Sequence, residues 1–141
     1  MSETASQDER LCPFSKPIIG KWCDCPHAVL AERCSGKMTC SLEESQRERC
    51  ASLVELFKER ARFVLALGND NTELTHAQSM KIRCGGLLGM QRLLQPDAAR
   101  PPRVLEVIAE AESRYGELSG FPFSEIVPDI QAFSHRARRN G

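Results

Sequence analysis

Apolar residues recur at spacings of three and four along most of the chain after residue 41, which is the pattern of helices with one buried face. The first predicted helix spans residues 41–67. A capping box, Ser41 to Glu44, indicates its start, and the turn-forming segment Gly68 to Asn71 indicates its end. The side chains expected to face inward are Leu53, Leu56, Phe57, Phe63, Val64 and Leu67.

Three further helices are expected after residue 74. A second capping box, Thr75 to Gln78, begins a helix that continues to about Leu94. A third helix follows Pro101 over residues 102–115, and Pro128 suits the first turn of a last one. No segment alternates apolar and polar residues convincingly as a strand would. The predicted fold is therefore all-α, a small bundle of about four to five helices with an N-terminal cysteine-rich, metal-organised loop region.

The helix over residues 75–94 contains three glycines, Gly85, Gly86 and Gly89. A glycine in a helix interior costs about 0.8–1 kcal/mol relative to alanine, so a compensating contact is expected. Gly85 and Gly89 are four residues apart and share one face of the helix. We therefore predict a close-approach surface here, against the cysteine-rich loop or a partner protein.

The chain divides into a polar N-terminal tail, a cysteine-rich segment and the helical part. Residues 1–10 have no periodicity and are expected to be a flexible tail. Residues 11–40 are rich in proline and cysteine and predict a metal- or cluster-binding loop, with one short helix over Pro26 to Arg33. Residues 41–141 form the predicted bundle, and residues 11–141 together are expected to make one compact domain.

Composition limits the possible partners and the compartment. The 19 Lys and Arg residues balance the 19 Asp and Glu residues, so duplex nucleic acid is not an expected partner. No secretory signal and no transmembrane segment is recognised, which predicts a cytoplasmic protein. The basic C-terminal end, His135 to Arg139, leaves peripheral docking on an acidic protein, a lipid or RNA as a further option.

Six of the seven cysteines lie between Cys12 and Cys50. In a reducing compartment such a density of thiols indicates a metal, an iron–sulfur cluster or redox chemistry. Eight residues separate Cys25 from Cys34, and five separate Cys34 from Cys40. The predicted ligands are the four most closely spaced thiols, and Cys12 and His27 are reserve ligands. The four are Cys23, Cys25, Cys34 and Cys40.

The spacing favours an iron–sulfur cluster over zinc, which stays the alternative cofactor. Structural zinc takes cysteine pairs two to four residues apart, whereas a cluster distributes its ligands over several irons. The dipeptides Cys12-Pro13 and Cys25-Pro26 resemble the proline that follows the last cysteine of bacterial ferredoxin runs, although the ferredoxin spacing is absent. A disulfide framework and plain reduced thiols remain open. Cys50 and Cys84 are interpreted as small buried hydrophobes.

The motifs of common catalytic sites are absent from the sequence, including the Cys-x-x-Cys redox pair. The chain is therefore not expected to be an enzyme, with a thiol oxidoreductase built on Cys23 and Cys25 as the exception. The predicted function is that of a small cytoplasmic iron–sulfur protein, acting in electron transfer or as an accessory subunit within a larger redox or metalloprotein complex. The alternative is a zinc-stabilised helical adaptor without redox activity.

Overall fold

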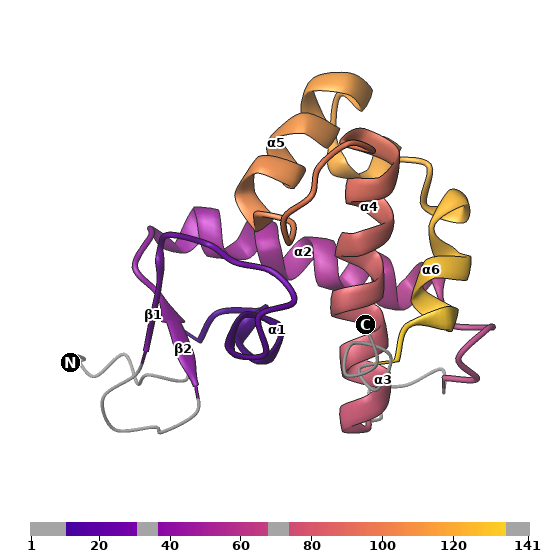
Figure 1. Ribbon diagram of the computed structural model, residues 1–141, viewed down its shortest axis with the longest axis horizontal. Coiled ribbons are helices and arrows are strands. Elements are labelled where there is room, and N and C mark those ends of the chain that lie inside the picture. Colours follow the sequence, from indigo (N-terminus) through magenta and orange to yellow (C-terminus); the bar gives the residue numbers. More distant parts are fainter. Residues whose placement is uncertain (1–10, 31–36, 68–73, 135–141) are drawn as a thin grey trace.

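The computed structural model describes residues 11–30, 37–67 and 74–134 of the chain. Its helices are α1 (Ser15–Ile19), α2 (Glu44–Arg60), α3 (His76–Met80), α4 (Gly86–Leu94), α5 (Val104–Tyr115) and α6 (Val127–Ala132). A π-helix, Lys81–Gly85, joins α3 to α4, and two 3₁₀ turns, Leu118–Gly120 and Phe123–Glu125, lie between α5 and α6. Figure 1 shows α2 crossing the molecule, with α1 and the strands near its amino end and α6 near its other end.

The fold is mostly helical, but it also contains a small antiparallel sheet. Strands β1 (Ala28–Leu30) and β2 (Met38–Cys40) pair with Ala28 opposite Cys40, and Leu11 forms an isolated bridge to Thr39. The all-α prediction was therefore only partly correct. The helix predicted over Pro26 to Arg33 is wrong where it can be examined, because Ala28–Leu30 are a strand; residues 31–33 lie outside the described ranges.

The first long helix is shorter than the sequence predicts. It begins at Glu44, and Ser41 does not cap it because the Ser41 hydroxyl donates to the His27 carbonyl (3.0 Å). The chain leaves the α-helix after Arg60, and the following turn is closed by hydrogen bonds from Ala66 and Leu67 back to Phe63 and Arg62. Ala66 takes the left-handed conformation that ends such turns (φ 55°). Phe63, predicted to face inward, is 94% exposed as a result.

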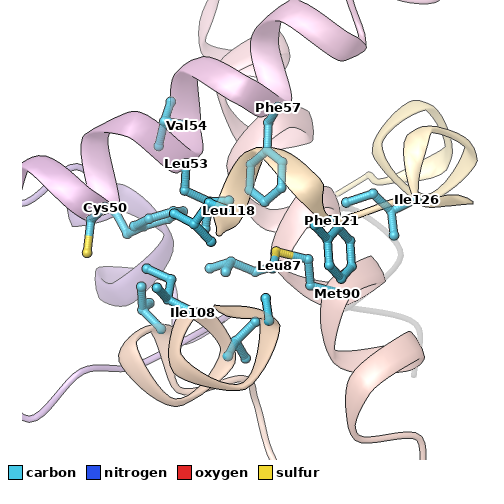
Figure 2. Packing of buried hydrophobic residues seen from close by; sticks show 14 of the residues in the cluster. Cys50, Leu53, Val54, Phe57, Leu87, Met90, Ile108, Leu118, Phe121 and Ile126 are labelled. Carbon is cyan, nitrogen blue, oxygen red and sulfur yellow. The ribbon is translucent and has the colours of Figure 1, made fainter. Parts of the chain in front are cut away.

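The helices after residue 74 begin close to where the sequence predicts, although the π-helix Lys81–Gly85 interrupts the one predicted to continue to about Leu94. Thr75 and Gln78 form the predicted capping box, with the Gln78 amide donating to the Thr75 hydroxyl (3.1 Å). Pro128 lies in the first turn of α6. These helices surround one apolar core with α2, to which Leu53, Phe57, Leu87, Met90 and Ile108 contribute fully buried side chains (Figure 2). No helix in the described ranges is long and apolar enough to cross a membrane.

The three glycines do support a close approach, but the neighbours are helices of the same chain. A Cβ on Gly85 would lie 2.6 Å from the Cα of Ile130, and one on Gly89 would lie 2.7 Å from the Cβ of Ile126. A Cβ on Gly86 would lie 2.4 Å from the ring of Phe57 on α2. The predicted contact with the cysteine-rich loop or a partner is therefore replaced by packing of the π-helix and α4 against α2, α6 and the residue before α6.

Candidate functional site

Two Cys-Pro turns repeat the same local geometry in the cysteine-rich segment. The first Cys-Pro turn, Cys12 to Ser15, is closed by a hydrogen bond from the Ser15 amide to the Cys12 carbonyl (3.0 Å). The second, Cys25 to Ala28, is closed by the equivalent bond from the Ala28 amide to the Cys25 carbonyl (3.1 Å). Proline fits the second position of such a turn because its φ is already fixed near the required value.

In both turns backbone amides donate to the cysteine sulfur. The Phe14 amide does so to Cys12, and the amides of His27 and Ala28 do so to Cys25; each bond lowers the pKa of the thiol that accepts it. An amide donor stabilises a thiolate more than a neutral thiol. These hydrogen bonds oppose part of the effect of burial, which is the largest influence on both thiols and raises their pKa overall.

The small sheet places Cys12 and Cys40 on the same face. The Cys12 amide donates to the Met38 carbonyl (3.0 Å), so Cys12 lies opposite Met38, two residues from Cys40 on β2. Side chains in this diagonal relationship share one face of a sheet, typically about 7–8 Å apart. Cys12 and Cys40 are both buried.

Cys25 and Cys50 complete a group that we name the thiol cluster: Cys12, Cys25, Cys40 and Cys50. Cys25 is half-buried and lies in the turn that leads directly into β1, whose Ala28 pairs with Cys40. Cys50 lies on α2, and Figure 2 shows its sulfur at the edge of the apolar core, on the opposite side from Ile126. α2 and the sheet together therefore gather thiols from four separate places in the sequence.

The thiols of this cluster influence one another electrostatically. Burial raises the pKa of Cys12 to about 11, and the charges of Cys40 and Cys25 raise it further. Burial likewise raises the pKa of Cys50 to about 12, with contributions from Cys12, Cys25 and Cys40. The pKa of Cys25 is raised by burial and by Cys40. Burial, and after it the charges of the neighbouring thiols, therefore favour the protonated forms of Cys12, Cys25 and Cys50.

The four ligands predicted from spacing occupy different surroundings. Cys25 and Cys40 belong to the thiol cluster, whereas Cys34 lies outside the described residues. Cys23 is only 2% exposed, and after burial the largest cause of its raised pKa is the charge of Cys84, which is 1% exposed. The charges of Cys12 and Cys25 are also among the causes, so Cys23 is influenced by the thiol cluster as well as by Cys84. The ligand set itself remains a prediction.

The two reserve ligands lie in different places, and so do the two cysteines that the sequence analysis interpreted as buried hydrophobes. Cys12 belongs to the thiol cluster, whereas the His27 side chain lines a surface pocket of about 550 Å³ beside Cys25. Cys84 packs with Met80 and Phe133 in a small apolar group, as expected of a buried hydrophobe. Cys50 was missed as a cluster member, although its position three residues before Leu53 places it on the buried stripe of α2.

The thiols of the cluster are not arranged in the geometry that coordinates a metal ion. Within the described ranges, no group of three or more Cys, His, Asp or Glu side chains is arranged to hold a metal ion. None of the six cysteines that the structure describes forms a disulfide bond. No disulfide framework is therefore formed by the described part of the cysteine-rich segment.

The second Cys-Pro turn is anchored to the start of α5. The Asp24 amide donates to the Pro102 carbonyl, and the Val104 amide donates to the Asp24 carbonyl, both at 3.0 Å. Arg103 lies 3.9 Å from the Asp24 carboxylate and lines the pocket beside Cys25. Cys25 is thus the member of the thiol cluster that faces a solvent-accessible pocket.

No protein-family model, curated protein or solved structure matches this chain. The functional argument therefore depends on the arrangement of the residues. The protein is mostly helical and has a cluster of thiols at one end.

The metal-free protein is expected to lose stability between about pH 9 and 11. The folded-state pKa values of Cys12 and Cys50 lie above the ordinary value of 9.0, so their contribution is complete below pH 9 and decreases as pH rises. At pH 10 each thiol lowers the free energy of unfolding by about 1.4 kcal/mol relative to pH 7. Urea denaturation of reduced, metal-free protein at several pH values measures this.

The control is the Cys50→Ala variant, which lacks one of the two thiols. Its free energy of unfolding should depend less steeply on pH between 8 and 10 than that of the unaltered chain. Equal slopes in the two proteins would contradict the assignment to Cys50.

Proposed function

We propose that this protein binds an iron–sulfur cluster through the thiol cluster, and that it carries electrons or serves as an accessory subunit of a larger redox enzyme. The observation that carries the proposal is the repeated Cys-Pro turn, in which backbone amides donate to the sulfurs of Cys12 and Cys25 beside two further thiols. Hydrogen bonds to sulfur are one of the means by which proteins set the properties of such clusters. The four ligands proposed from this arrangement are Cys12, Cys25, Cys40 and Cys50.

The distribution of the thiols favours a cluster over a single metal ion. A zinc ion requires all of its sulfurs at about 2.3 Å from one point, whereas a cluster is bound by thiolates on several irons. No group of three or more Cys, His, Asp or Glu side chains in the described part of the chain is arranged around one point. The proposal therefore favours the group whose ligands are spread over several metal ions.

Thiol redox catalysis is a weaker explanation of the same residues. An attacking cysteine needs a lowered pKa so that the thiolate is present at neutral pH. The pKa values of Cys12, Cys25 and Cys50 are all raised, with burial as the largest cause. Their chemistry is better suited to ligation, in which the metal displaces the protons.

The second candidate is a zinc-stabilised adaptor. It is favoured by exposed apolar residues on the same half of the chain as the thiols, because an adaptor needs a surface that contacts its partner. Val29 and Leu30 on β1 are 51% and 61% exposed. Such a protein would keep the ligands proposed here and have no redox role.

Metal analysis after anaerobic purification and reconstitution separates these functions. The expected protein is brown, contains iron and sulfide in equal amounts, and loses its visible absorption when a chemical reductant is added. Stoichiometric zinc in a colourless protein, with no uptake of iron and sulfide, would establish the adaptor instead. If neither metal binds, both functions are wrong.

A further inference from the structure

An open surface groove of about 750 Å³ lies between α2 and the 3₁₀ turn Leu118–Gly120. The residues of α2 that line it extend from Glu48 to Glu59, at spacings of three and four that place them on one face of the helix. At 1.5 Å per residue this face is about 16 Å long. The groove is therefore long enough to hold a segment of about three helical turns.

Every charged residue that lines the groove is a glutamate with an exposed side chain. These residues are Glu48, Glu55, Glu59 and Glu117. Only Glu59 forms an ion pair with another residue that the structure describes, to Arg62 at 2.6 Å. Glu55 and Glu59 are four residues apart on α2, a spacing at which like charges destabilise a helix. A cationic partner would offset that repulsion.

Apolar side chains line the same groove. Ala51 is exposed, Leu56 is half-buried and Leu118 is buried. Leu118 belongs to the apolar core and Leu56 packs against it, so the core holds both side chains in place. Apolar surface bordered by polar side chains is typical of a site that contacts another protein.

We propose that this groove docks a basic amphipathic segment of a partner protein, with lysine or arginine opposite the glutamates and apolar side chains against Leu56 and Leu118. Complementary charge is the observation that selects this partner. The negative potential of the groove repels nucleic acid and anionic lipid, so neither is a suitable occupant. The inference goes beyond the proposed function and does not depend on metal binding.

The test measures how the reduced, full-length chain binds a synthetic peptide, by fluorescence anisotropy. The probe is a fluorescein-labelled peptide of lysine, leucine and alanine, about 14 residues long, with its leucines on one helical face. Ala51→Arg introduces a bulky cation into the groove, and Glu48→Gln with Glu117→Gln removes two of its charges. Glu55 is left unchanged because its charge opposes the lowering of the Arg83 pKa by burial.

Matched substitutions at exposed sites outside the groove are the controls. Ala99→Arg adds the same side chain elsewhere, and Asp97→Asn with Glu125→Gln removes the same number of charges. Each groove variant is expected to bind the peptide about fivefold more weakly than the unaltered chain, whereas the controls should match it. Binding to the unaltered chain should weaken as the salt concentration rises.

Three results would overturn the proposal. The first is that the unaltered chain does not bind the peptide, or that groove variants and controls bind it equally well. The second is equal binding of a peptide with glutamate in place of lysine, because charge would then play no part. The third is tighter binding of a peptide with the basic C-terminal sequence of this chain, residues 132–141, that is lost in Ala51→Arg. That result would assign the groove to a second copy of the chain instead of a separate partner.

Discussion

Serine in place of any one of the four clustered thiols is expected to abolish stable metal binding. The hydroxyl of serine is a hard, weakly acidic ligand that replaces a soft thiolate poorly. Iron and sulfide content after reconstitution, with visible absorption as a second measure, reports the loss. The four variants are Cys12→Ser, Cys25→Ser, Cys40→Ser and Cys50→Ser.

The same experiment decides between this ligand set and the one predicted from spacing. Serine at Cys23 or Cys34 should leave metal content unchanged if the thiol cluster binds the metal. Cys84→Ala is the matched control for a buried cysteine, because Cys84 lies in apolar surroundings with Met80 and Phe133. Loss of metal from Cys23→Ser and Cys34→Ser, with retention in Cys12→Ser and Cys50→Ser, would return the assignment to the spacing of the sequence.

Alanine at Gly85 is expected to destabilise the fold by about 3 kcal/mol, although alanine is the better helix former. The new Cβ would lie 2.6 Å from the Cα of Ile130 and 2.8 Å from the Asp129 carbonyl oxygen. Both are backbone atoms, so α6 must move as a whole. Thermal unfolding should show a decrease in Tm of roughly 6–12 °C.

A substitution at an exposed helical site calibrates this effect. Ala51 lies on the exposed face of α2, so Ala51→Gly should cost only about 1 kcal/mol through helix propensity. Gly85→Ala raises helix propensity and Ala51→Gly lowers it, but both are expected to lower the stability of the fold. If Gly85→Ala raised the Tm, the contact between the π-helix and α6 would be wrong.

The sequence predicts the part of the fold whose determinants are local. Thr75 and Gln78 are three residues apart, so their capping box can be read directly, and Pro128 likewise marks the start of α6. The sheet could not be read in this way. It depends on the pairing of Leu11 with Thr39 and of Ala28 with Cys40, which joins short segments with no alternating pattern of their own.

The thiol cluster was only partly predictable for the same reason. Spacing along the chain predicted Cys23, Cys25 and Cys40 as ligands, whereas the position of Cys50 inside a helix indicated a small buried hydrophobe. In the structure α2 begins shortly after β2, and after burial the charges of Cys12, Cys25 and Cys40 raise the pKa of Cys50. Cys23 is influenced by Cys12 and Cys25 as well. The repetition of cysteine followed by proline was visible in the sequence. The sequence did not indicate that the two dipeptides form turns of the same kind.

If the proposed cluster binds to Cys50, the supply of metal would determine how stable the folded chain is. Its side chain belongs to the same apolar cluster as Leu53 and Phe57, so a ligand bound to its sulfur is bound by the folded chain and not by the unfolded one. A ligand at a hundred times its Kd adds about 2.7 kcal/mol to the stability of the whole fold. Under the proposed function, chains made without iron would lack that contribution, unfold more often and be degraded sooner.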